Sequence, residues 1–124
     1  MSLALKDKKG KIGFIHAANG IIAVTKSEWN FRFHLLMMIL VMGAGLFFRL
    51  SSIEWIAVVI VIGMVLVSEM MNTTIEKIID YIKPEFHPAA RFIKDAAAGA
   101  VLISAITAVI VGILIFLPKF IMLF

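Results

Sequence analysis

The sequence predicts an all-α integral membrane protein with three membrane-spanning helices. Three uncharged apolar runs, residues 35–48, 55–67 and 96–117, are separated by short polar connections. Hydrophobic residues make up 62% of the 124 residues and the mean hydropathy is +1.05, whereas soluble domains contain roughly 45–50% apolar residues. A soluble domain of this length could not bury so much apolar surface, so residues 1–124 are expected to form a single domain in a bilayer.

The segment before the first span is expected to form a helix on the membrane surface. Residues 1–11 are polar and basic. Residues 12–27 are moderately apolar, with Ile15, Ala18 and Ile22 at helical spacing, which indicates a short amphipathic surface helix. The glycines in this stretch leave a flexible tail as the alternative.

The bounds of the spans follow from the length that a membrane requires. About 20 helical residues cross the roughly 30 Å hydrocarbon layer. The first span is therefore expected over residues 31–49, and the second over residues 53–72 after a tight polar turn. The second helix should continue to about residue 82, because a proline follows at Pro84.

The third span is expected over residues 96–117. A helix beginning near Pro88 leads into it, because proline is favoured in the first turn of a helix. Pro118 is expected to end the span.

Basic residues predict the orientation of the chain. Six of the 12 lysines and arginines precede the first span and four lie between the second and the third, which leaves Arg49 and Lys119 for the other side. The N-terminus and residues 72–95 are therefore expected in the cytoplasm, with residues 49–54 and the C-terminus outside. The basic residues form no single patch, so nucleic acid is not an expected partner.

One helix face gathers polar groups where the second span leaves the membrane. At about 100° per residue, three polar residues lie within roughly 60° of Glu69: Asn72, Glu76 and Asp80. Aligned carboxylates are unfavourable unless a cationic group lies against them. Glu69 is also flanked by apolar residues near the membrane boundary, where an ionisable side chain is expected to be functional.

The carboxylate and amide oxygens of these side chains can bind a complex of a metal ion with a nucleotide. Mg²⁺ prefers one or two carboxylates completed by water and nucleotide phosphates. Glu76, together with Glu28 at the other cytoplasmic boundary, can supply carboxylates, and Lys94 beside Asp95 can neutralise phosphate charge. The sequence has no standard phosphate-binding loop. The histidines show no metal-ligand spacing and are expected to pack at the interface: His16, His34 and His87.

The run EMMNTTIEKIID, residues 69–80, closely resembles the signature of the prokaryotic diacylglycerol kinase family, which are small trimeric membrane lipid kinases. The resemblance covers nearly the whole chain. It includes Ala18-Asn-Gly20, Glu28-x-Asn30-Phe-Arg32-x-His34, Glu54-Trp55, Lys83-Pro-Glu-Phe-His-Pro88 and Lys94-Asp-Ala-Ala-Ala-Gly-Ala-Val-Leu102. Thr74 and Lys77 depart from the family pattern, and Lys77 can alter nucleotide affinity.

The resemblance implies a homotrimer in the bacterial inner membrane that transfers phosphate from ATP, with Mg²⁺, to a lipid hydroxyl at the cytoplasmic face. It implies that Glu69 is the catalytic base and that Glu28 and Glu76 hold the metal. The implied nucleotide-binding residues are Asn72, Glu76, Asp80, Lys94 and Asp95.

The acceptor lipid is a separate expectation. Residues 84–88 and 94–100 look more like the undecaprenol kinase branch, which favours a polyprenol over diacylglycerol. The alternative function is a small oligomeric proton-coupled transporter that uses Glu69 as its carrier carboxylate. That function would not explain why the other polar groups gather on one side of the membrane.

Overall fold

The computed structural model describes residues 3–124, which form four helices and, within that range, no strand. The helices are α1 (Leu3–Ser27), α2 (Trp29–Phe47), α3 (Ser52–Ile82) and α4 (Pro88–Leu123). Three of them, α2, α3 and α4, are long and apolar enough to cross a membrane. The prediction of an all-α membrane protein with three spans is confirmed.

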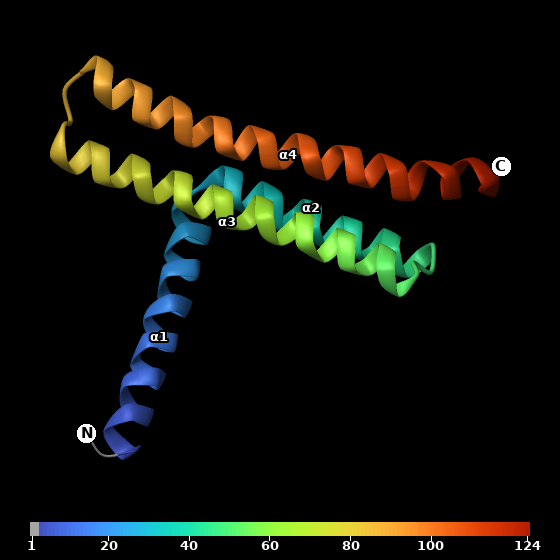
Figure 1. Ribbon diagram of the computed structural model, residues 1–124, viewed down its shortest axis with the longest axis horizontal. Helices are drawn as coiled ribbons and strands as arrows, with labels where there is room; N and C mark the ends of the chain where they lie inside the picture. The colour runs from blue at the N-terminus through green and yellow to red at the C-terminus, as the bar shows by residue number, and fades with distance from the viewer. Residues whose placement is uncertain (1–2) are drawn as a thin grey trace.

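Helix α3 lies between α2 and α4. Figure 1 shows α3 and α4 running side by side in opposite directions, with α2 along the half of α3 nearest the α2–α3 turn. The backbones of α2 and α4 do not approach each other, since no Cα atoms of the two helices lie within 8 Å. An open groove is therefore left between them, with α3 as its floor.

Helix α1 projects away from the other three helices (Figure 1). It begins at Leu3, well before the expected start at residue 12. Its large apolar side chains are exposed, among them Ile12, Phe14 and Ile22. These side chains need a membrane or another protein surface to cover them.

Helices α3 and α4 are longer than a membrane is thick. The 31 residues of α3 span roughly 46 Å at 1.5 Å per residue, against a hydrocarbon layer of about 30 Å. At the end joined by the α3–α4 loop, both helices extend beyond the point where α1 meets α2 (Figure 1). The polar face of α3 begins beside α2, at Glu69, and continues past the α1–α2 junction into this extension.

The α2–α3 turn closes the opposite end tightly. Arg49 has a φ of 55°, and the N–H of Leu50 donates to the carbonyl of Gly45 over 3.1 Å, which is the Schellman ending of a helix. Helix α3 then begins with a capping box: Ser51 N–H donates to Glu54 Oε1 over 2.9 Å, and Glu54 N–H donates to Ser51 Oγ over 3.2 Å. The turn therefore pairs its own backbone groups.

Two further contacts hold this end together. A Cβ on Gly45 would lie 2.6 Å from Trp55 Cη2, so the indole packs where only glycine leaves room. Lys119 Nζ lies 3.0 Å from Glu54 Oε2, which links the end of α4 to the start of α3.

Helix α4 does not end at Pro118 but continues through it to Leu123, and the end of the third span near residue 117 stays a prediction. A proline inside a helix removes one backbone hydrogen bond, and membrane helices tolerate this loss better than soluble ones. The extra turn carries Lys119 to its contact with Glu54.

Candidate functional site

The inner end of the polar face of α3 is buried. Glu69 is only 3% exposed, and Thr73, one turn further along, is buried as well. Asn72 Nδ2 lies 3.4 Å from Glu76 Oε1, a long hydrogen bond between neighbouring turns. Asn72 Oδ1 is buried with no hydrogen-bond partner. Such an oxygen is costly to leave unsatisfied, so it is a candidate ligand atom.

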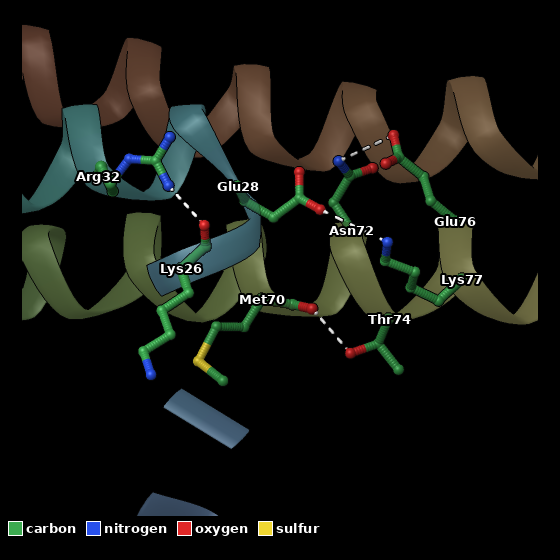
Figure 2. Close-up of polar contacts among 8 residues, drawn as sticks. All are labelled: Lys26, Glu28, Arg32, Met70, Asn72, Thr74, Glu76 and Lys77. Carbon is green, nitrogen blue, oxygen red and sulfur yellow. Dashed lines mark hydrogen bonds and ion pairs between the residues drawn. The ribbon is translucent and has the colours of Figure 1, made fainter. Parts of the chain in front are cut away.

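Glu28 reaches this face from the break between α1 and α2. Its backbone is extended, with φ −115° and ψ 114°, and this conformation separates the two helices. Figure 2 shows its carboxylate pointing across to α3, where Glu28 Oε1 lies 4.0 Å from Lys77 Nζ. The charges of Glu28 and Glu76 both act on Glu69. Carboxylates from two parts of the chain therefore face the same stretch of α3.

Arg32 fixes the position of this break. Its Nη1 atom donates to the carbonyl of Thr25 over 3.0 Å, and to that of Lys26 over 2.8 Å (Figure 2), at the end of α1. Its guanidinium also lies 5.8 Å from the ring centroid of Trp29. Because carbonyls at a helix end have no partner within the helix, a fixed cation there stabilises the α1–α2 junction.

His34 was expected to pack at the membrane interface, because the histidines show no metal-ligand spacing. In the structure it also lies against Glu69. Its Nε2 atom lies 3.9 Å from Glu69 Oε2, and its side chain is largely buried. Asn30, one turn earlier on α2, also lies beside Glu69. The i,i+4 spacing of Asn30 and His34 was the available signal in the sequence, but it could not show which helix the pair faces.

The remaining expected site residues lie further out, towards the α3–α4 loop. The ammonium of Lys94 on α4 makes an ion pair with the carboxylate of Asp80 on α3. Asp95 instead pairs with Arg91 on its own helix, 3.2 Å from Oδ1 to Nε, and both side chains are exposed.

The structure thus divides the expected residues into two groups. The inner group is Glu28, Glu69, Asn72 and Glu76, and the outer group is Asp80 and Lys94. In residues 9–124, whose side chains the structure describes, no hydrogen bond or ion pair joins Asp95 to either group.

The inner group fits a magnesium ion that is completed by other ligands. Within the described part of the chain, no three His, Asp or Glu side chains form a closed metal site. Mg²⁺ does not need one, since it is usually bound through one or two carboxylates with water and phosphate oxygens. Glu28, Glu76 and the unpartnered Asn72 Oδ1 are oxygen donors of that type.

An apolar groove of about 450 Å³ adjoins the inner group. It lies between α2 and α4 over α3, and its walls include Met38, Leu66 and Ala108. His34 lies at its edge and also contacts Glu69. The buried carboxylate is therefore connected to an apolar space within the spanning part of the molecule.

The sequence matches known proteins over most of its length. The family described as prokaryotic diacylglycerol kinase matches residues 15–116. The undecaprenol kinase of Bacillus subtilis (strain 168) is 43% identical over 106 residues, which cover 86% of this chain and 86% of that one.

Two diacylglycerol kinases are less similar to this chain than that relative. The protein of Synechocystis sp. is 33% identical over 108 residues, covering 86% of this chain and 62% of its own. The protein of Helicobacter pylori (strain J99) is 28% identical over 91 residues, covering 73% of this chain and 71% of its own. The family match extends from α1 into α4 and includes both groups of site residues.

Proposed function

This chain belongs to the prokaryotic diacylglycerol kinase family, and we propose that it is a lipid kinase whose preferred acceptor is undecaprenol. Diacylglycerol is the second candidate. The relative named for undecaprenol is 43% identical over 86% of this chain, whereas relatives named for diacylglycerol are 33% identical over 86% of it, 28% over 73% and 39% over only 44%. The family implies ATP as the phosphoryl donor.

One observation carries the assignment of the site. Glu69 is buried against His34, which lines an apolar groove, and Asn72 and Glu76 lie one and two turns further along the same helix as Glu69. A lipid hydroxyl can reach Glu69 from the bilayer, while a nucleotide reaches Glu76 from water. The two substrates of a lipid kinase, one apolar and one highly charged, need this separation.

In the proposed reaction Glu69 is the general base. It accepts the proton of the lipid hydroxyl as the hydroxyl oxygen forms its bond to the γ-phosphorus of ATP. The bond from that phosphorus to the β–γ bridging oxygen breaks, and ADP leaves with the electron pair. Such a transfer needs mainly positioning and stabilisation of charge, and a correctly placed base adds roughly 10²–10⁴-fold.

The nucleotide is proposed to bind along the rest of the polar face. Glu28 and Glu76, with Asn72, would hold Mg²⁺, which when bound neutralises charge on the phosphates. In the outer group, Lys94 would stabilise phosphate charge, with its ammonium held in place by Asp80. Asp95 is proposed to act at the edge of the same nucleotide site.

The assembly and orientation are also proposals. We propose a homotrimer in the bacterial inner membrane, with the N-terminus cytoplasmic, the C-terminus outside and α1 on the membrane surface. The distribution of lysine and arginine supports this orientation. The large apolar area that a single chain exposes, on α1 as well as on the spans, supports contact with both lipid and other copies.

The transporter alternative gains no support. Glu69 adjoins an apolar groove, and the named relatives are kinases.

The test is transfer of labelled γ-phosphate from Mg·ATP by purified protein in mixed micelles. Undecaprenol and diacylglycerol are supplied separately, and Glu69→Gln is the control. Phosphorylation of undecaprenol at a higher kcat/KM, lost in the variant, is the expected result. A higher kcat/KM for diacylglycerol would reverse the order of acceptors, and transfer to neither lipid by folded protein would contradict the proposed function.

A further inference from the structure

The groove beside Glu69 has one polar side chain among the 12 residues that line it, and that side chain is His34. The other residues of the lining are hydrophobic or glycine. His34 Nε2 is also 3.9 Å from Glu69 Oε2. The imidazole therefore lies between the carboxylate and the apolar space.

The apolar space continues along the molecule. A second hollow shares Val109 and Gly112 with the first, and it extends to Phe48 and Phe120 near the opposite end of the bundle. From Phe33 to Phe48, α2 rises roughly 22 Å at 1.5 Å per residue. The groove therefore runs through much of the spanning region and has its polar end at His34.

From this arrangement we propose that the groove holds the hydrocarbon chain of the acceptor lipid, and that His34 hydrogen-bonds its hydroxyl group beside Glu69. This inference rests on the proposed function and adds the residue that recognises the acceptor. A neutral imidazole has one N–H donor and one nitrogen acceptor, so His34 can donate to the lipid oxygen. Both lone pairs of a hydroxyl oxygen can be used, one for His34 and one for the attack on phosphorus.

The shape and polarity of the groove favour a lipid over a helix from another copy. An acceptor lipid has one hydroxyl at the end of a long apolar chain, and the groove likewise has one polar group at one end. The groove is also continuous with the buried carboxylate through His34. A neighbouring helix would cover the apolar walls, but it would not explain why a histidine lies at that end of the groove.

The test compares His34→Leu and His34→Gln with Ile39→Leu, a control at an exposed position of α2 outside the groove. Initial rates are measured with purified protein in mixed micelles, with undecaprenol varied at saturating Mg·ATP. Loss of a hydrogen bond to the acceptor should lower kcat/KM for undecaprenol by about 10–100-fold in His34→Leu. His34→Gln should lose less because the amide can still donate, and Ile39→Leu should match the original protein.

Hydrolysis of ATP without lipid, and the KM for ATP, separate acceptor recognition from a structural role. Both should stay within about twofold in His34→Leu, because the residue does not touch the nucleotide. An equal fall in lipid-independent hydrolysis would overturn the inference, since His34 would then act through Glu69 or through the fold. Unchanged kinetics for undecaprenol would overturn it too.

A second pair of variants tests the occupant of the groove. Ala108→Leu narrows the groove, whereas Ala100→Leu makes the same change at an exposed position of α4 outside it. Ala108→Leu alone should raise the KM for undecaprenol more than the KM for dioctanoylglycerol, whose chains are short. Dissociation of the oligomer with unchanged lipid kinetics would overturn the inference, because the groove would then be covered by another copy.

These outcomes are distinct from failure of the proposed function. If the original protein phosphorylates no lipid, the kinase assignment fails. If the original protein and His34→Leu phosphorylate undecaprenol equally well, only the role of His34 fails.

Discussion

At the α2–α3 turn the backbone groups are paired and Glu54 has a cationic partner, whereas near Glu69 one buried amide oxygen has no hydrogen-bond partner. The turn combines a Schellman ending, a capping box and the contact of Lys119 with Glu54. Near Glu69 the nearest basic group, on His34, is 3.9 Å away. Asn72 Oδ1 has no partner at all.

This difference indicates that the α2–α3 turn stabilises the fold, whereas the region around Glu69 is arranged to bind a ligand. An unsatisfied buried polar atom costs about 1–3 kcal/mol, so an end that keeps one is less stable than it could be. Substitutions at the α2–α3 turn should therefore change the stability of the fold, and substitutions near Glu69 should change function. The following predictions test this division, from the largest expected effect to the smallest.

Glu69→Gln should lower kcat for lipid phosphorylation by roughly 10²–10⁴-fold, because the general base is lost. The midpoint of thermal unfolding should stay the same or rise, since the amide keeps the shape of the side chain without a buried charge. Steady-state kinetics and thermal unfolding in the same micelles measure both. Substantial remaining activity, or a clear loss of stability, would show that Glu69 has a structural role instead.

Glu76→Gln should weaken binding of Mg·ATP about 10–100-fold, which is the usual loss when the groups that support a metal are altered. The Mg²⁺ concentration needed for half-maximal activity should rise as well. A titration of activity against Mg²⁺ at fixed ATP measures this change. An unchanged Mg²⁺ requirement would remove Glu76 as a ligand, and Glu85→Gln, in the exposed α3–α4 loop, is the control.

Gly45→Ala should lower the free energy of unfolding by about 1–3 kcal/mol, because the added methyl group overlaps the Trp55 ring. Gly43→Ala is the matched control, since its Cβ would meet nothing within 4 Å. Denaturant unfolding in micelles compares the two, and kcat of the protein that remains folded should not change. Equal stability of the two variants would show that the indole can move away.

Arg49→Gly should raise the free energy of unfolding by about 1 kcal/mol, because a non-glycine residue with a φ of 55° is strained. Arg49→Ala removes the same charge but keeps the Cβ, so it should give no such gain. Unfolding of the two variants under one set of conditions separates backbone strain from charge. If both variants change the free energy of unfolding equally, the change comes from the loss of the charge.

The sequence predicted the features that depend on one helix. The spacing of Glu69, Asn72 and Glu76 already placed them on one face of α3, since a helix turns by a fixed angle per residue. The three apolar runs likewise predicted three spans, because membrane thickness sets their length.

The features that depend on packing between helices could not be predicted in this way. The contact of His34 with Glu69 depends on how α2 is rotated against α3. The ion pair of Asp80 with Lys94 depends on the pairing of α3 with α4. The continuation of α4 through Pro118 was not predicted either, since a proline rule derived from soluble helices ignores the support that a membrane helix receives.

The spacing along α3 also limits how the chain can change in length. Glu69 and Glu76 are seven residues apart on one unbroken helix, which is close to two full turns and roughly 10 Å of rise. One inserted residue between them would rotate one carboxylate by about 100° away from the other. Insertions and deletions should therefore be excluded from this stretch and accepted in the α3–α4 loop. The length of α3 between the two carboxylates thus sets the distance between lipid and nucleotide.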